Sequence, residues 1–205
     1  QMAYFLFGGV GLYAIFRAVE GRLDALKSSR ASRSGIRFAL FLAAAITGAG
    51  IAAVQFVPAI DYVTEHSRRI QTTRDAGGES GIEWSSSWSM HPEEGLSMIV
   101  PQFAGNSAGG APWTDNTYWG RNPFKNNHEY AGLVILLLAG VSLLPGARRR
   151  MSLFFAGLGS LSILFAMGAH TPVWRIFYEA VPGISLFRAP SQAIFLFGFA
   201  ATTLA

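Results

Sequence analysis

Five apolar blocks alternate with polar segments along the chain. They cover residues 2–16, 38–60, 130–144, 151–167 and 193–205. Their apolar residues form long runs and do not recur at the spacing of an amphipathic helix or a half-buried strand. A transmembrane helix needs about 20 consecutive, mostly apolar residues, and the second block meets this length. We therefore expect an all-α fold, a polytopic transmembrane helix bundle of about five spans, in a single membrane domain covering residues 1–205.

The blocks at the two ends of the sequence look truncated. The first has about 15 residues and starts beside the first residue, and the fifth is still apolar where the sequence stops. No basic segment or small-residue cleavage site identifies the first block as a signal peptide. The sequence is therefore expected to be a fragment of a longer protein. The third and fourth blocks are separated only by PGARRR, which predicts a helical hairpin with a tight turn.

Basic residues concentrate in two of the segments between the blocks. Residues 17–37 and 148–150 hold nine of the 16 Lys and Arg residues. Residues 61–129 include five basic and nine acidic residues. Because Lys and Arg accumulate in cytoplasmic loops, the first two segments are expected inside, and residues 61–129 and 169–192 outside. Residues 61–129 are thus expected to form a long extracytoplasmic loop.

The composition excludes several functional classes. Only 14% of the residues are charged, against roughly 25% in a typical soluble domain, and the mean hydropathy is +0.32. Because the chain has no cysteine, disulfides, thiolate zinc sites, iron–sulfur clusters and cysteine nucleophiles are excluded. With most basic residues in cytoplasmic loops, a net charge of +4 gives no reason to expect nucleic acid as a partner. The sequence has no GxxxxGK[ST] motif, so it encodes no nucleotide-hydrolysing loop. Its four histidines never stand four residues apart, so we expect no protein-made metal site.

The long outer loop holds four of the five tryptophans, a residue that concentrates at membrane–water interfaces. After the first two of them, the sequence HPEEGLSMIV begins with a proline and two acids and continues with apolar residues. Proline in the first turn and carboxylates near the positive helix end are typical of a helix start. We expect a short interfacial helix on the outer membrane surface between about Ser89 and Val100, with Glu93 and Glu94 capping its start.

Several strings carry a resemblance to a known family. They are VQFVPAIDYVTEHSRR after the second block, YWGRNPF and HEYAGL before the third, and HTPVWRIFYEAVPGISLFRAPSQAIFLF around the start of the fifth. The sequence resembles the bacterial YfhO family of large integral membrane proteins over essentially its whole length. Members of that family are much longer and resemble the GT-C class of glycosyltransferases, which use polyprenyl-phosphate sugars. The resemblance implies a bacterial cytoplasmic (inner) membrane location and a role in decorating cell-envelope polymers.

The sequence departs from this pattern in two places. In the GT-C pattern the catalytic carboxylate lies in the first outer loop, and this sequence opens on a later helix, so the catalytic base is expected to lie outside it. Gln192 follows FRAPS, where a second basic residue would be needed for an arginine pair. GT-C-like enzymes often use a divalent cation with the lipid phosphate, but no cofactor site is recognisable in this sequence.

Charged residues gather where apolar blocks meet the outer loops. The second block is followed by Asp61, Glu65, Arg68 and Arg69, spaced to share one face if the helix continues. Arginine binds phosphate in a two-pronged geometry, so these two arginines and Arg188, before the fifth block, are candidate contacts to a lipid-linked phosphate. We expect Arg68 and Arg188 to meet at the outer mouth of the bundle, with Asp61 and Glu65 as candidate catalytic acids. The alternative is a solvated helix end and an Arg188 that only extends to the interface.

A second group of candidates precedes the third block. Tyr118, Trp119 and Arg121 stand upstream of Glu129. Aromatic side chains stack on sugar rings, and Glu129 would take a proton from an acceptor hydroxyl if burial raised its pKa. The alternative is an aromatic belt with polar anchors. Further along, His170 is expected to end a helix.

Two functions of different classes follow from these patterns. The first is a membrane glycosyltransferase-like protein that moves a sugar from a polyprenyl phosphate to an envelope polymer acceptor on the outer face, by direct displacement at the anomeric carbon. The alternative is a non-catalytic membrane scaffold or transporter subunit whose outer loop docks a partner. None of the five blocks contains an ionisable side chain apart from tyrosine, which favours chemistry at the outer surface over ion-coupled transport.

Overall fold

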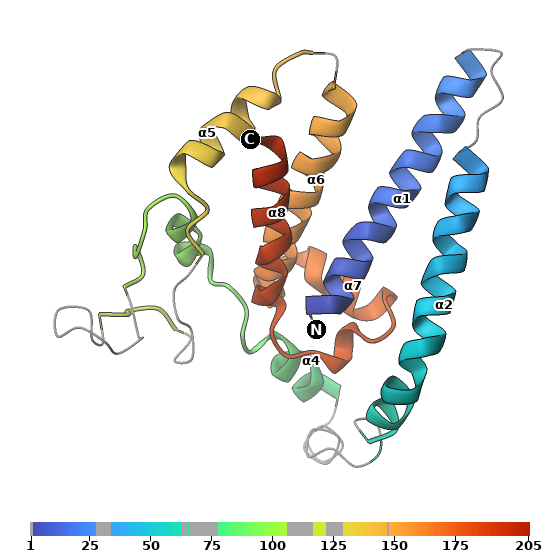
Figure 1. Cartoon of the computed structure of the whole chain (residues 1–205). Coiled ribbons are helices and arrows are strands. Elements are labelled where there is room, and N and C mark those ends of the chain that lie inside the picture. Colours follow the sequence, from blue (N-terminus) through green and yellow to red (C-terminus); the bar gives the residue numbers. More distant parts are fainter. Residues whose placement is uncertain are drawn as a thin grey trace. The chain divides into compact units, whose positions relative to one another are not determined.

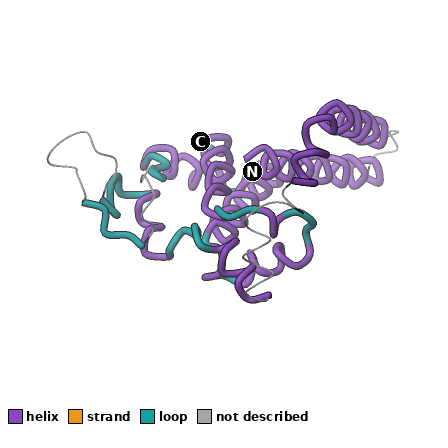
Figure 2. Tube along the Cα trace, turned by 90° about the horizontal axis from the view of Figure 1, so that it is seen from below, coloured by secondary structure: helices purple, strands orange, loops and turns teal. Residues whose placement is uncertain are grey.

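The computed structural model describes residues 2–27, 34–62, 65, 78–105, 117–121, 129–146 and 148–205. Every regular element in these ranges is a helix, as Figures 1 and 2 show. The chain forms two compact units: residues 3–80, the N-terminal unit, and residues 81–205 with residues 1–2, the C-terminal unit. The all-helical part of the expected fold class is confirmed for these ranges.

The N-terminal unit contains α1 (Met2–Lys27) and α2 (Ser34–Asp61), which run antiparallel (Figure 1). Both contain a segment that is long and apolar enough to cross a membrane, Met2–Asp24 and Gly35–Asp61. The first apolar block is therefore not too short to span. Its helix continues through the polar residues that follow, where Arg17 forms an ion pair with Glu20 one turn later at 2.5 Å.

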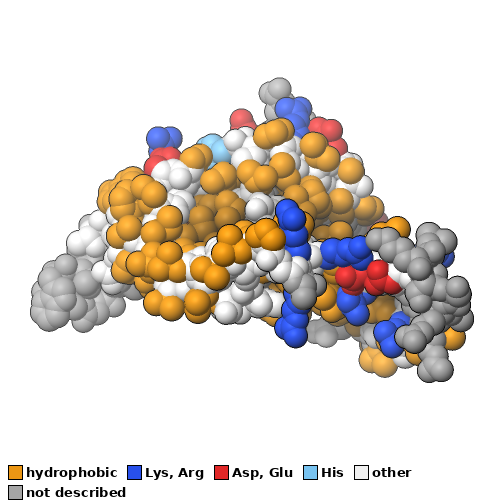
Figure 3. Space-filling model, turned by 90° about the horizontal axis from the view of Figure 1, so that it is seen from above, with side chains coloured by type: hydrophobic (Ala, Val, Ile, Leu, Met, Phe, Trp, Pro, Cys, Tyr) orange, Lys and Arg blue, Asp and Glu red, His pale blue; other side chains and the backbone are white. Residues whose placement is uncertain are grey.

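The surface of α2 is apolar on all sides. None of the residues in its most apolar 18-residue window is buried, and Ile46, Ile51 and Val54 are 71%, 75% and 85% exposed. A helix that is hydrophobic all round is typical of a membrane span or of the core of a large protein. Hydrophobic side chains also cover much of the face shown in Figure 3.

In the C-terminal unit, α8 (Ile194–Leu204) packs against both α5 (Leu133–Ser142) and α6 (Arg149–Ala166) (Figure 1). Phe155 and Leu158 of α6 form a buried cluster with Ala200 of α8. Gly159 allows close approach here, because a Cβ at this position would lie 3.4 Å from the Cβ of Ala200. Small residues at helix contacts are typical of membrane bundles.

The structure supports fewer spans directly than the expected five. In the ranges described above, only α1 and α2 have the length and hydropathy to cross a membrane. Helix α5 has 10 residues and α8 has 11, which at 1.5 Å per residue is about half of a hydrocarbon core of about 30 Å. The third block gives a short helix because Gly132 has a φ of 90°, outside the helical region, and α5 begins only after it.

The third and fourth blocks form two helices joined by a short connection, as expected, but these helices do not pack tightly against each other. Helices α5 and α6 make little contact with each other, because α8 packs against both of them. The two helices are still joined by a short connection of residues 143–148. Helices α5 and α6 thus pack against α8, near the end of the chain, more than against each other.

Short helical elements lead from α6 to α8. They are η3 (Gly168–His170), α7 (Pro172–Ala180), η4 (Ile184–Leu186) and η5 (Pro190–Ala193). Trp174 of α7 is buried, and Phe177 meets Phe165 of α6 edge to face at 5.6 Å between ring centroids. His170 ends η3, so its expected position at a helix end is confirmed.

The segment before residue 105 contains α4 (Gly78–Ser86) and the 3₁₀ helix η2 (Pro92–Met98). The segment is tied to α6 by a backbone hydrogen bond from Met90 N to the carbonyl of Ala166 at 2.8 Å. The helix expected between Ser89 and Val100 is therefore present, as a tighter 3₁₀ helix. Its location at a membrane surface stays a prediction.

Candidate functional site

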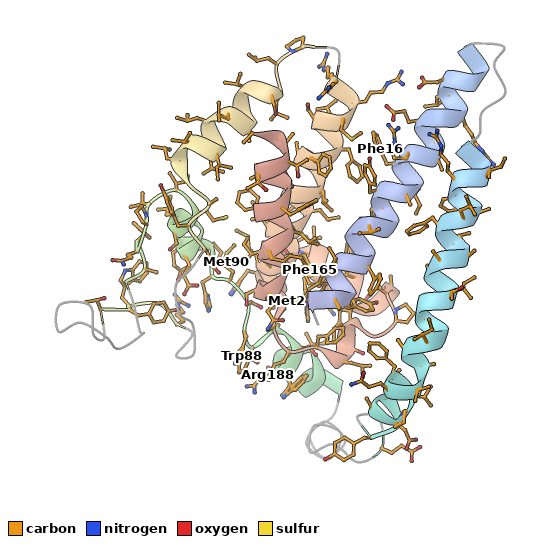
Figure 4. All side chains as sticks on the ribbon, viewed as in Figure 1. Met2, Phe16, Trp88, Met90, Phe165 and Arg188 are labelled. Atoms are coloured by element: carbon orange, nitrogen blue, oxygen red, sulfur yellow. The ribbon has the colours of Figure 1, made fainter. Side chains whose placement is uncertain are left out.

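Arg188 lies against side chains from a distant part of the sequence (Figure 4). The carbon of its guanidinium is 4.6 Å from the ring centroid of Trp88 and 5.7 Å from that of Trp84. Its Nε donates a hydrogen bond to Oγ of Ser87 at 2.9 Å. We call Trp84, Ser87, Trp88 and Arg188 the Arg188 cluster.

Two local structures position this cluster. Trp84 belongs to α4 and Trp88 follows four residues later, about one helical turn away, so both rings lie on the same side of this segment. Beside them, the buried hydroxyl of Ser85 donates a hydrogen bond to the carbonyl of Ser185 at 3.1 Å. Gly183 takes the left-handed conformation, with a φ of 86°, and so turns the chain from α7 into η4 before Arg188.

The cluster orients the guanidinium and leaves part of it available. The faces of tryptophan rings attract a cation, and the Nε hydrogen bond sets the rotation of the group. Arg188 is exposed, and no acceptor in the described part of the chain binds its Nη atoms. Planar paired N–H donors are suited to two-pronged binding of a phosphate or carboxylate group. The cluster can therefore bind an anion.

A second group of polar side chains lies around η2. Glu94 is 1% exposed, and its Oε1 accepts a hydrogen bond from the Tyr118 hydroxyl at 2.7 Å. Gly120 packs against both groups, and a Cβ there would overlap them. Glu93 is more exposed and forms an ion pair with Arg121, with 3.3 Å between Oε1 and Nε. We call Glu93, Glu94, Tyr118 and Arg121 the Glu94 cluster.

The expected role of the two glutamates as helix caps needs correction. Both lie in the first turn of η2, after His91 at the N-cap and Pro92 at the first helical position. The N-cap makes no side-chain hydrogen bond, and the Glu94 side chain turns toward Tyr118. Glu94 therefore holds the loop at residues 117–121 against η2, in addition to lying at a helix start.

His91, at the N-cap of η2, contacts His170 of η3, the short helix that follows α6. The rings of His91 and His170 are tilted by 49°, with centroids 4.6 Å apart. The pKa of His91 is lowered, first by burial and then by the nearby His170, and these effects outweigh the raising effects of Glu94 and Glu93. His91 therefore favours its neutral form in the fold.

The structure describes only some of the candidate residues that follow the second block. Arg68 and Arg69 lie outside the described residues, so their expected meeting with Arg188 lies outside them as well. Asp61 and Glu65 are exposed at and just after the end of α2, in the N-terminal unit. Glu129 is partly buried shortly before α5.

The candidate sugar-stacking residues all make contacts within the protein. Tyr118 and Arg121 bind the glutamates of η2. The indole N–H of Trp119 donates to the carbonyl of Phe103 at 3.0 Å, and the two rings meet edge to face at 5.6 Å between centroids. About half of Trp119 is still exposed. These contacts match the alternative of an aromatic belt with polar anchors as well as they match a sugar site.

Sequence reasoning missed the partners of Arg188. The spacing of four between Trp84 and Trp88 could have indicated a shared helix face. Nothing in the sequence, however, pairs WSSSW with an arginine about one hundred positions later. That pairing depends on the packing of α4 beside η4, which only the fold supplies.

The described residues provide no set of three or more His, Asp or Glu side chains that could hold a metal ion. The site thus consists of one oriented arginine beside two tryptophans, and of a buried, hydrogen-bonded carboxylate a few residues away. Comparison with known proteins gives no match to a family model, to a curated protein or to a solved structure.

Proposed function

We propose that this protein is a membrane glycosyltransferase-like protein of the YfhO and GT-C kind. It would transfer a sugar from a polyprenyl phosphate to a cell-envelope acceptor on the outer face of a bacterial cytoplasmic membrane. The observation that carries the proposal is the Arg188 cluster. It places an oriented guanidinium with available Nη donors two residues before η5 and α8, an apolar stretch of residues 190–204.

This arrangement suits a lipid phosphate for a physical reason. A polyprenyl tail stays in the hydrocarbon while its phosphate remains at the interface, where tryptophan and arginine side chains also concentrate. Trp84 and Trp88 beside Arg188 have this composition. In the proposed site the Nη atoms of Arg188 bind the phosphate, and the tryptophans fix the arginine.

The proposed reaction is a direct displacement. An acceptor hydroxyl oxygen forms a bond to the anomeric carbon while the bond from that carbon to the phosphate oxygen breaks. The hydroxyl proton passes to a carboxylate, for which Asp61, Glu65 and Glu129 are the candidates in this chain. The negative charge that develops on the departing lipid phosphate is stabilised by Arg188, with Arg68 and Arg69 as further candidates.

The proposal includes a multi-pass arrangement. Helices α1 and α2 cross the bilayer. Helix α6, which is less apolar than these two but whose 18 residues cover about 27 Å, crosses it as well, with Arg148–Arg150 on the cytoplasmic side, as expected for basic loops. The end of α6 at Ala166 then lies at the outer surface, where the Ala166 carbonyl accepts the hydrogen bond from Met90 N. The shorter helix α8 packs against α5 and α6 within the C-terminal unit.

The proposal is tested by comparing Arg188→Lys and Arg188→Ala in the intact protein in nanodiscs. A radiolabelled polyprenyl monophosphate serves as the binding probe, and sugar transfer is measured in the native membrane. Because lysine keeps the charge but loses the planar fork, both variants should lose about tenfold or more in affinity, the equivalent of about 1.5 kcal/mol or more. The matched control is Arg175→Ala, which removes an exposed arginine paired with Glu179 in α7.

Full binding by both Arg188 variants would show that this arginine is only an interface anchor. Unchanged lipid binding and transfer, together with loss of a copurifying protein, would favour the scaffold or transporter alternative. Expression level and elution volume of each variant are measured alongside, so that a folding defect is recognised.

A further inference from the structure

The segment from η2 to residue 103 exposes more apolar surface than a loop in water normally does. Leu96, Ile99 and Val100 are each exposed by nearly half. Phe103 and Trp119 add further exposed ring surface beside them. A contiguous exposed apolar patch marks a surface that contacts lipid or another protein.

Two backbone hydrogen bonds fix where this segment lies within the C-terminal unit. At its start, Met90 N binds the carbonyl of Ala166, the last residue of α6, at 2.8 Å. At the end of η2, the carbonyl of Met98 accepts a hydrogen bond from Ala131 N, two residues before α5, at 3.1 Å. Helix η2 therefore runs from the end of α6 to the beginning of α5.

The lengths of these elements show how deep η2 reaches. Helix α6 has 18 residues and α5 has 10, about 27 Å and 15 Å at 1.5 Å per residue. The two helices are joined at their other ends by a short connection, so with those ends level the beginning of α5 falls about 12 Å short of the end of α6. The seven residues of η2, at 2.0 Å per residue, cover about 14 Å and fill this difference. In Figure 1 the green η2 lies below the beginning of α5, and the chain reaches it from α4.

From this we infer that residues 92–103 form a re-entrant segment. It enters the outer leaflet at Pro92, reaches about half the depth of the bilayer at Met98, and presents Leu96, Ile99 and Val100 to lipid acyl chains. The inference rests on the membrane placement of α6 in the proposed function, and it is independent of sugar transfer. It replaces the expected helix on the membrane surface by a segment that descends into the membrane.

The backbone at the end of η2 and the Trp119 indole are paired, although the buried Ser97 hydroxyl has no hydrogen-bond partner among the described residues. Non-helical backbone is tolerated inside a membrane where its polar groups are paired or covered by protein. The N–H groups of Ile99 and Val100 both bind the carbonyl of Leu96, at 3.0 and 2.9 Å. The indole N–H of Trp119 is satisfied by the carbonyl of Phe103, so its ring can enter hydrocarbon without an unpaired donor.

Charge and continuity favour lipid as the occupant of this surface. The charged pair of Glu93 and Arg121 lies at the start of η2, where lipid headgroups are expected. Beyond Met98, the apolar surface continues onto α5, where Val134 and Leu137 are also exposed. A surface that is polar at its outer end and apolar toward the middle of α5 matches the polarity profile of one leaflet.

The test uses the absence of cysteine from the chain. Ile99→Cys is spin-labelled in the intact protein in lipid nanodiscs, and collision rates with oxygen and with a water-soluble nickel chelate are measured. Oxygen concentrates in lipid, so the label at position 99 should collide readily with oxygen and rarely with the chelate. Its depth should fall between that of Ala169→Cys, exposed in η3 after the end of α6, and that of Leu137→Cys on α5. Leu96→Cys provides a second position if Ile99→Cys does not elute as a single species.

The control Val54→Cys on α2 distinguishes a failure of the re-entrant segment from a failure of the membrane placement. If position 99 is reached by the chelate, or lies at the same depth as position 169, the re-entrant segment is wrong. A position 54 that is exposed to lipid in the same experiment shows that the membrane placement still holds. Protection of position 99 from both reagents means that a protein covers it and also overturns the inference. Chelate access at positions 54 and 137 contradicts the membrane placement itself.

Discussion

At the scale of single residues, neighbours of identical chemistry have different roles. Glu93 and Glu94 are adjacent, yet only Glu94 is buried, where it accepts the Tyr118 hydrogen bond. A buried carboxylate is costly unless it is paired or hydrogen-bonded, so Tyr118 stabilises the fold through it. The sequence predicted two equivalent acids at a helix start. Their difference arises because the loop at residues 117–121 packs onto one of them.

Tyr118→Phe should destabilise the protein, because it leaves one oxygen of the buried Glu94 carboxylate without its donor. The expected cost is about 1–3 kcal/mol, seen as a lower thermal midpoint in detergent. Tyr178→Phe is the control, since it keeps the ring that contacts Trp174 in α7 and should change stability by less than about 0.5 kcal/mol. Equal midpoints for the two variants would contradict a structural role for the Tyr118–Glu94 hydrogen bond.

His91 should make stability depend on pH. The pKa of His91 is lower in the fold than its ordinary value of about 6.5, so the unfolded chain takes up the proton first as the pH falls. Stability should therefore decrease as the pH is lowered from 7 through this value, and His91→Gln should reduce that decrease. Thermal midpoints between about pH 7.5 and pH 5.5 provide the measurement, over the range where an ordinary histidine titrates.

His170→Gln is an informative companion variant. It removes the neighbouring charge that helps to lower the pKa of His91 but leaves the burial of His91. Its pH dependence should lie between those of the native protein and His91→Gln. An unchanged pH profile in His91→Gln would mean that other groups govern the acid sensitivity.

At the scale of elements, small residues decide which apolar helices meet. Gly159 is buried at the contact of α6 with α8, whereas Gly157, on the same helix, has no atom near the position of a Cβ. The Ser162 hydroxyl adds a buried hydrogen bond to the carbonyl of Ala193, at 2.5 Å, near the start of α8. Packing and such hydrogen bonds hold helices together in a membrane, where the hydrophobic effect between them is lost.

The pair Gly159→Leu and Gly157→Leu tests this packing. The first substitution inserts a side chain against Ala200 and Phe197 and should cost about 1–3 kcal/mol by overpacking. The second points into open space and should be nearly neutral, although both replace glycine by the same residue on one helix. Thermal midpoints in one detergent compare them, and a larger loss for Gly157→Leu would contradict the assigned contact face.

At the scale of the whole molecule, the basic residues predict sidedness. Arg148–Arg150 begin α6, and the Arg188 cluster follows its other end through α7 and η4. If α6 crosses the membrane, these two groups lie on opposite sides, with the arginine triplet in the cytoplasm. The candidate site then faces outward, as the proposed transfer requires.

This sidedness is measured with single cysteines and a membrane-impermeant thiol reagent in intact cells. Ala169→Cys, exposed at the end of α6 near His170, should be labelled. Gly146→Cys, exposed in the connection between α5 and α6, should be labelled only after the cells are permeabilised. The reverse pattern would invert the proposed topology, and labelling of both positions in intact cells would remove α6 as a span.

By itself, the sequence determined that the protein is helical, where its apolar segments lie and that a helix starts at Pro92, because these depend on local composition and on the periodicity of neighbouring residues. It did not determine how far the helices extend. Arg17 and Glu20 continue α1 through an ion pair between successive turns, and Gly132 delays α5 by its positive φ. The distribution of apolar residues along the sequence shows neither effect, because one depends on a single ion pair and the other on the φ angle of a single glycine.

Only the tertiary structure decided which segments meet. Trp84 and Trp88 surround Arg188, Glu94 is buried under Tyr118, and α8 packs against both α5 and α6. Each contact joins positions far apart in the chain, and each depends on matching surfaces of two elements. The sequence contains the residues that form those surfaces, but their shapes exist only after the helices have packed, because side-chain burial and hydrogen-bond geometry are set by both partners together.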